Sequence, residues 1–155
     1  MSGLRTYRQW DSSIRRTCFR ACFAIAAIGF ELIAFGQCTN ATAFGTVAAP
    51  TNGTPLTIST CTYQSEYNTI NAVVAGATYT VANPCGEYIT VPQTTFNGPV
   101  VAQGNAPLTF TAPANGTYFV HYNTSAACGT ASTCCTTTIT CTSCTVTPPA
   151  GACTA

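Results

Sequence analysis

The chain has 155 residues and a formal net charge of +1, and only 6% of its residues are charged. Its five basic residues are all arginines, and they lie at Arg5, Arg8, Arg15, Arg16 and Arg20. Because residues 37–155 contain no lysine or arginine that could neutralise phosphates, this composition excludes nucleic-acid binding.

Residues 1–36 are typical of a secretory signal peptide. An arginine-bearing segment precedes an apolar run from Ala21 that Glu31 interrupts, and the small residues Ala34 and Gly36 predict cleavage before Gln37. An uncleaved anchor is the weaker alternative, because the run is shorter than the roughly 20 residues that span a bilayer. We therefore expect a secreted, extracellular or cell-surface protein with a leader helix and no membrane contact after cleavage.

The remaining chain has the composition of a β-protein, since threonine, valine and aromatic residues are frequent and helix formers are scarce. Residues 37–55 are expected to form an extended N-terminal arm or a further strand. Short strand-like runs, separated by Gly, Pro and Asn turn signals, then predict strands at 56–62, 78–82, 87–91, 100–103, 108–112, 117–123 and 136–142. Residues 143–155, which contain Pro148 and Pro149, are expected to be an extended tail. The predicted fold is all-β: an antiparallel β-sandwich or jelly roll over residues 56–142, stapled by disulfides.

Several segments after the expected leader resemble one known family. They are Cys61-Thr-Tyr-Gln-Ser-Glu-Tyr-Asn-Thr-Ile, Gly76-Ala-Thr-Tyr-Thr-Val, Glu87-Tyr-Ile-Thr-Val, Phe96 to Gly104, Pro107-Leu-Thr-Phe, and Gly116 to Asn123 with Cys128 to Cys134. Over about residues 57–142 the chain resembles the β-sandwich repeat module of secreted Bacteroidetes surface proteins, similar in motif order to CUB and pre-peptidase C-terminal domains. This resemblance implies a jelly-roll-like sandwich and an adhesin-like setting, and it carries no catalytic motif. The chain departs from the family as a single module without a sorting domain, and in having cysteines at Cys85 and Cys135.

Cysteine density indicates an oxidising compartment and a disulfide framework. Eleven cysteines occur in the chain, and those after the leader are Cys38, Cys61, Cys85, Cys128, Cys134, Cys135, Cys141, Cys144 and Cys153. Local spacing favours Cys128 with Cys134, the departure from the family favours Cys85 with Cys135, and Cys61 with Cys141 would tie the first and last strands. Cys38, Cys144 and Cys153 then remain, either for bonds between subunits or for one intrachain bond and one capped thiol.

Residues 37–155 contain few side chains that could support catalysis or bind a metal or cofactor. Their only carboxylate side chains are Glu66 and Glu87, interpreted as solvated or hydrogen-bonded residues, and His121 is interpreted as a packed or edge-facing strand residue. No nucleophile elbow, phosphate loop or dinucleotide motif is present. The zinc-like spacing of Cys134, Cys135, Cys141 and Cys144 is better explained by disulfides, and two glutamates are too few for a strong calcium site. We expect no enzyme, no metal and no cofactor.

Four sequons are candidate glycosylation sites, and glycans would keep an uncharged surface soluble. They begin at Asn40, Asn52, Asn115 and Asn123.

The functional hypothesis is a structural subunit of a secreted extracellular filament or surface layer whose partners are copies of itself. Sheet edges without lysine favour strand pairing between chains, with the arm Thr39–Thr54 completing a neighbour's sheet and disulfides sealing the polymer. The alternative is an adhesin-like module that binds carbohydrate or another surface. Its candidate aromatic residues are Tyr63, Tyr67, Tyr79, Tyr88 and Phe96.

Overall fold

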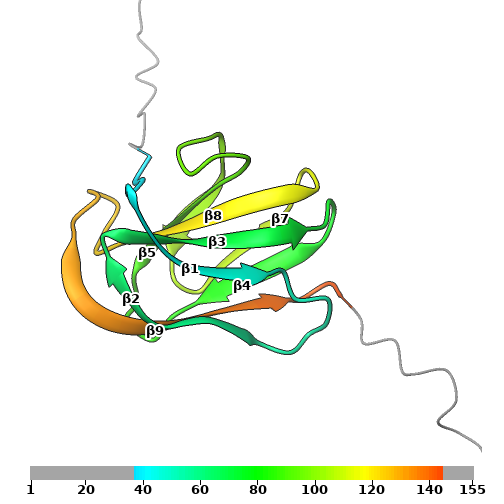
Figure 1. Cartoon of the computed structure of the whole chain (residues 1–155), viewed down its shortest axis with the longest axis horizontal. Coiled ribbons are helices and arrows are strands. Elements are labelled where there is room, and N and C mark those ends of the chain that lie inside the picture. Colours follow the sequence, from blue (N-terminus) through cyan, green and yellow to red (C-terminus); the bar gives the residue numbers. More distant parts are fainter. Residues whose placement is uncertain (1–36, 145–155) are drawn as a thin grey trace, which may run out of the picture. The chain divides into compact units, whose positions relative to one another are not determined.

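The structure is a computed structural model that describes residues 37–144, and these form nine β-strands with no helix (Figure 1). The strands are β1 (Thr42–Ala48), β2 (Leu56–Gln64), β3 (Glu66–Val73), β4 (Thr78–Ala82), β5 (Tyr88–Pro92), β6 (Val100–Asn105), β7 (Leu108–Thr111), β8 (Gly116–Asn123) and β9 (Ala131–Cys141). The expected leader and most of the expected tail lie outside the described residues. No helix able to span a membrane occurs between residues 37 and 144.

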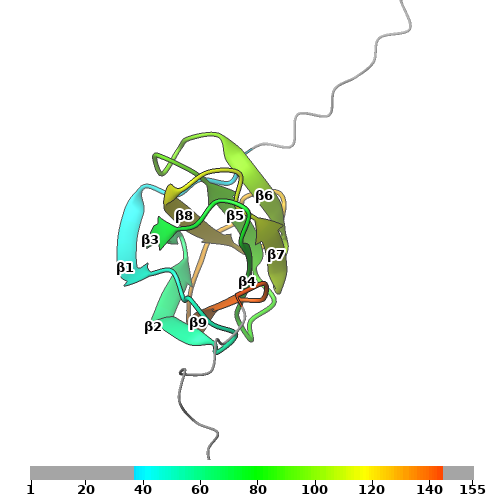
Figure 2. The same cartoon turned by 90° about the vertical axis from the view of Figure 1, so that its right-hand side faces the viewer.

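Two sheets pack face to face as a jelly roll (Figure 2). One sheet has the order β1-β3-β8-β5-β6 and the other has the order β2-β9-β4-β7. Strands β2 to β9 pair with one another only in antiparallel fashion, and their two four-stranded layers follow the double-sheet order of this fold. The predicted all-β sandwich is therefore confirmed.

Strand β1 departs from the predicted antiparallel pattern, because it pairs with β3 in parallel. The register shifts between Ala43 and Thr46, and the Gly45 backbone N–H donates to the Asn68 side-chain oxygen over 2.7 Å within this irregularity. A Cβ on Gly45 would lie 2.8 Å from that oxygen and 3.1 Å from the Ile58 carbonyl oxygen. Glycine is needed here because β1 approaches the core so closely.

Strand β3 was not predicted from the sequence, because the buried polar residue Asn68 interrupts the expected alternation of apolar and polar residues. Only Ser65 separates β2 from β3, and the chain passes there from one sheet to the other. Asn68 is fully buried in β3 and donates to Thr62, Tyr122 and Thr137, which satisfies the amide inside the sandwich.

The core is built from alternate residues of the strands, as the period of two requires. Its largest fully buried apolar and aromatic side chains are Tyr79, Tyr118, Tyr122, Ile70, Ile89 and Ile139. Strand β9 shows the alternation most clearly, because Cys135, Thr137, Ile139 and Cys141 are buried while the threonines between them face outward.

Four disulfides staple the described domain, and they correct two of the expected pairings. Cys85 bonds Cys135 as expected. Cys128 bonds Cys38 instead of Cys134, and Cys61 bonds Cys134 instead of Cys141. The pleat explains the second correction, because Cys134 and Cys135 point to opposite faces of β9 and Cys134 lies beside β2. Cys141 bonds Cys144, so Cys38 and Cys144 belong to intrachain bonds and only Cys153, outside the described residues, is left from the expected trio.

We predict that the Cys38–Cys128 bond contributes more stability than the Cys141–Cys144 bond. The two bonds span 90 and 3 residues, so loop closure favours the longer one. Replacing both partners by alanine should cost about 4–5 kcal/mol for Cys38 and Cys128 and about 2 kcal/mol for Cys141 and Cys144. Urea unfolding of the two double variants measures this, and equal losses would contradict the loop-closure explanation.

Candidate functional site

The two glutamates and the histidine of the described domain are buried. Glu66 is 8% exposed, Glu87 is 2% exposed and His121 is fully buried. Because residues 37–144 contain no aspartate, lysine or arginine, their exposed side chains carry no acidic or basic group other than tyrosine and cysteine.

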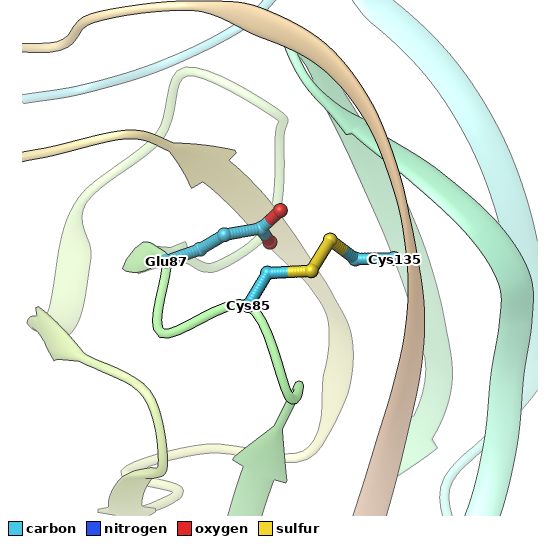
Figure 3. Close-up of side chains that lie close together, drawn as sticks. All are labelled: Cys85, Glu87 and Cys135. Carbon is cyan, nitrogen blue, oxygen red and sulfur yellow. A yellow bond between two sulfur atoms is a disulfide. The ribbon is translucent and has the colours of Figure 1, made fainter.

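Glu87 precedes β5 and its carboxylate lies beside a disulfide (Figure 3). One carboxylate oxygen accepts a hydrogen bond of 2.5 Å from Gln64 Nε2, and the other accepts one of 2.7 Å from Asn83 Nδ2. Burial raises the pKa of Glu87 from 4.5 to about 7, and the hydrogen bond from Gln64 opposes part of this increase. Glu87 is therefore a hydrogen-bonded residue, one of the two interpretations made from the sequence.

Cys85, Glu87 and Cys135 have the geometry of a metal-ligand cluster, with one ligand atom of each within 4.8 Å of the others. The two sulfur atoms are bonded to each other, however, so neither is a thiolate that could bind a metal (Figure 3). The same bond fixes the loop that carries Glu87 to the inner face of β9. The cluster is therefore structural in the oxidised protein.

His121 lies in the middle of β8, and its imidazole holds the segment that leads into β1. Nδ1 accepts a 2.7 Å hydrogen bond from the Asn40 backbone N–H, and the Asn40 side chain donates to the carbonyl oxygens of Glu66 and Tyr122. Burial lowers the pKa of His121 from 6.5 to about 4, with an opposing contribution from the Phe96 backbone. The neutral imidazole is thus a packed strand residue, as expected from the sequence.

The two carboxylates and the imidazole are not assembled as an acid–base pair. Glu66 Oε2 accepts from the Tyr63 backbone N–H, whereas Glu87 binds Gln64 and Asn83, and His121 binds Asn40. Two cavities of the described domain, about 320 Å³ at Val100–Gln103 and about 250 Å³ between Gln93 and Tyr118, are lined by none of the three. The three groups are therefore not positioned to transfer a proton to one another.

Two of the four candidate glycosylation sites are removed by burial. Asn40 is 9% exposed and Asn123 is 1% exposed, and the Nδ2 atom of each donates to other groups in the domain. Asn52 and Asn115 are exposed and stay candidates. A sequon alone carries no information on burial, which explains why the sequence retained all four.

The candidate aromatic residues are only partly surface residues. Tyr79 is buried and Tyr63 is 38% exposed. Tyr67 stacks on Phe96 at 5.6 Å between ring centroids and meets Phe119 edge-on at 5.8 Å. Phe96 is 37% exposed, so these three rings form an aromatic cluster on the outer side of the five-stranded sheet.

A feature that the sequence reasoning did not identify is the outer face of the four-stranded sheet. The side chains that alternate with the core residues on β4, β7 and β9 are nearly all threonines (Thr78, Thr80, Thr109, Thr111, Thr136, Thr138, Thr140 and Thr142). We call this surface the threonine face. The alternation is visible along β9 in the sequence, but alignment between strands depends on a register that the sequence does not specify.

Comparisons with known proteins provide little further information. No protein-family model and no curated protein match the chain. Among solved structures, the chain is similar to the crystal structure of Aeromonas hydrophila PliG, a periplasmic lysozyme inhibitor of g-type lysozyme, with a TM-score of 0.47 and 12% identity over 64% of this chain and 96% of that chain. A likeness of this size carries no inference about function. The four disulfides are typical of proteins outside the cytoplasm.

We predict that Glu87 makes the folded state less stable at neutral than at acidic pH. Its folded pKa lies above the unfolded value, so its contribution is complete below pH 4.5 and is lost as pH rises through about 7. As the pH rises from 4.5 to 8, the unfolding free energy of Glu87→Gln should rise by about 2–3 kcal/mol relative to that of the unmodified protein. Denaturant titrations across this range measure the gain, and parallel pH profiles would contradict the buried-acid assignment.

His121 should have the opposite effect on the pH profile. Its folded pKa lies below the unfolded value, so its contribution is complete above pH 6.5 and is lost as pH falls through about 4. As the pH falls from 7 to 4, the unfolding free energy of His121→Gln should therefore rise by about 2–3 kcal/mol relative to that of the unmodified protein. A gain in the alkaline direction instead would show that the imidazole is charged in the folded protein.

Proposed function

We propose that the protein is a structural subunit of a secreted extracellular assembly, a filament or surface layer built from copies of this chain. The observation that supports this proposal is the absence of exposed acidic and basic side chains over the described domain, apart from tyrosine and cysteine. A surface near zero charge lacks the electrostatic repulsion that keeps soluble proteins apart, so it favours association.

Sheet edges provide the sites of association. The sheets end at β1 and β6 and at β2 and β7, and none of these strands carries the lysine or inward charge with which natural proteins protect an edge. Strand β1 is the most accessible of them in side-chain terms, since Thr42, Ala43, Phe44, Thr46 and Ala48 are exposed. Pairing of such an edge with another copy forms a filament when the contact is head-to-tail and does not close.

The arm needs a different role from the one expected for residues Thr39–Thr54. In this structure β1 completes the sheet of its own chain, and the disulfide between Cys38 and Cys128 secures the chain just before it. The proposed strand addition therefore uses β1 as an acceptor edge within its own domain and not as a strand donated to a neighbour. Bonds between subunits through Cys38 or Cys144 are also ruled out in the oxidised domain, because both are in intrachain disulfides.

An adhesin-like binding module is the second candidate function. The aromatic cluster of Tyr67, Phe96 and Phe119 favours it, because partly exposed rings are a common contact surface for sugars and other partners. Binding of a stable monomer to a glycan array, abolished by Phe96→Ala, would support this function over assembly.

We predict that charge placed on the β1 edge disperses the assembly. The secreted, unreduced protein should scatter light as high-mass particles, and the double variant Ala43→Lys with Ala48→Lys should scatter as single domains because two lysines disfavour edge pairing. The matched control is Thr51→Lys with Ala126→Lys, which adds the same charge at exposed positions outside every strand and should stay assembled. A monomeric unmodified protein would contradict the structural proposal, and dispersal of both variants would contradict the role of the edge.

A further inference from the structure

The Cys85–Cys135 disulfide joins an exposed residue to a buried one. Cys85 is exposed in the loop between β4 and β5, whereas Cys135 on the inner face of β9 is 1% exposed. None of the other three disulfides of residues 37–144 combines an exposed residue with a buried one. A thiol from solvent therefore meets this bond at Cys85, and Cys135 carries the sulfur that leaves.

The loop of residues 83–87 directs two side chains toward Cys135. Gly86 has a φ of +67°, in the left-handed region that glycine adopts without strain. Cys85 and Glu87 flank this glycine, and Figure 3 shows both side chains reaching toward Cys135. One carboxylate oxygen of Glu87 and the two sulfur atoms lie within 4.8 Å of one another. The carboxyl group is therefore held beside the sulfur that leaves.

Gln64 connects this carboxyl group to the buried sulfur. It is 4% exposed on β2, and its Nε2 donates to Glu87 Oε1 over 2.5 Å and lies 3.7 Å from Cys135 Sγ. Asn83 holds the other side of the carboxyl group, because its Nδ2 donates to Glu87 Oε2 over 2.7 Å. The two amides therefore fix the carboxyl group next to Cys135.

A buried leaving sulfur depends on the groups around it. Exchange releases this sulfur as a thiolate, and a leaving thiol of low pKa departs faster. Burial disfavours the thiolate charge and slows its departure. An N–H donor such as Gln64 Nε2 stabilises the thiolate, and a neutral carboxylic acid can transfer a proton to it. Burial keeps Glu87 protonated below its pKa of about 7, so this acid is present at mildly acidic pH.

We propose that the Cys85–Cys135 disulfide is a site of thiol–disulfide exchange with a low-molecular-mass thiol, and that Glu87 is its proton donor. The external thiolate attacks Cys85 Sγ, the S–S bond breaks, and its electron pair leaves with Cys135 Sγ. The Glu87 carboxyl group protonates this sulfur, which yields a mixed disulfide at Cys85, a Cys135 thiol and a Glu87 carboxylate. In the reverse direction the carboxylate recovers the proton, and the Cys135 thiolate attacks Cys85 and expels the external thiolate. No step uses the β1 edge, so exchange is independent of assembly.

The first measurement maps the mixed disulfide that glutathione forms with the purified, unreduced protein. After brief exposure, an acid quench and alkylation of free thiols, chymotryptic digestion and mass spectrometry should place glutathione on Cys85 and the alkyl group on Cys135. The Cys61–Cys134 bond is the matched comparison within the same molecule. It also has an exposed member, Cys134, but it belongs to no carboxylate-containing cluster among the described residues, so it should react at least about tenfold more slowly.

The second measurement is the rate of exchange per glutathione thiolate as a function of pH. The protonated share of Glu87 falls about tenfold between pH 6 and pH 8, because its pKa is about 7. The rate per thiolate should fall about tenfold over this range in the unmodified protein and stay constant in Glu87→Gln. Glu66→Gln, which removes the other carboxylate, is the matched variant and should keep the fall. Of the groups that face Glu87, Gln64 and Asn83 do not titrate, and burial raises the pKa of Tyr122, which stays neutral throughout.

A purely structural role for Glu87 predicts the opposite trend, because its ionisation above pH 7 destabilises the fold and would make the disulfide easier to reach. Three results would overturn the proposal: a rate per thiolate that is flat or rises with pH in the unmodified protein, an equal fall in Glu87→Gln, or a first adduct at another disulfide. Urea midpoints and the mass of the unreduced protein verify the folding of each variant, and the unmodified protein tests the proposal even where a variant does not fold. Exchange by a dispersed protein would overturn the assembly proposal alone, and fibres without this exchange would overturn the present one alone.

Discussion

The pleat of β9 is the constraint on which most of this structure depends. The strand lies between β2 and β4, so each of its residues points either into the sandwich or out of it. The inward residues close the core with Ile139, and the inward Cys135 bonds Cys85 in the loop before β5. The outward residues supply one strand of the threonine face, and Cys134 bonds Cys61 of the adjacent strand. A register slip of one residue would exchange these two sets and break the core, the disulfides and the surface together.

The interior of the sandwich contains polar residues that are hydrogen-bonded to defined partners. Asn68, Glu87 and His121 are buried, and hydrogen bonds reach the side-chain oxygens of Asn68 and Glu87 and the Nδ1 atom of His121. Such groups add little net stability, but their loss leaves unpaired partners, so they favour one arrangement of the strands over others. Asn40 and His121 position the start of β1, and Asn68 fixes the irregularity at Gly45. The buried polar groups thus specify where the parallel edge strand lies.

Local signals in the sequence predicted much of the fold. Strand β4 was placed at its observed bounds, and β2, β5, β6, β7 and β8 lie within a few residues of the predicted ranges because Gly, Pro and Asn turns separate them. Strand β3 was missed because its inward positions include Asn68, and a polar core residue breaks the expected alternation. The disulfide map required tertiary proximity, although the adjacent positions of Cys134 and Cys135 already indicate bonds on opposite faces. The residues of the candidate site were visible in the sequence, but their burial and the cross-strand rows of threonines were not, because both depend on register.

An uncharged, disulfide-stapled sandwich is suited to contact with other neutral surfaces. The central proposal is that it associates with other copies of itself. Electron microscopy of the purified, unreduced protein tests this most directly. The account predicts regular fibres or sheets in which sandwich domains meet through the β1 edge. Dispersed particles of the size of one domain would contradict it.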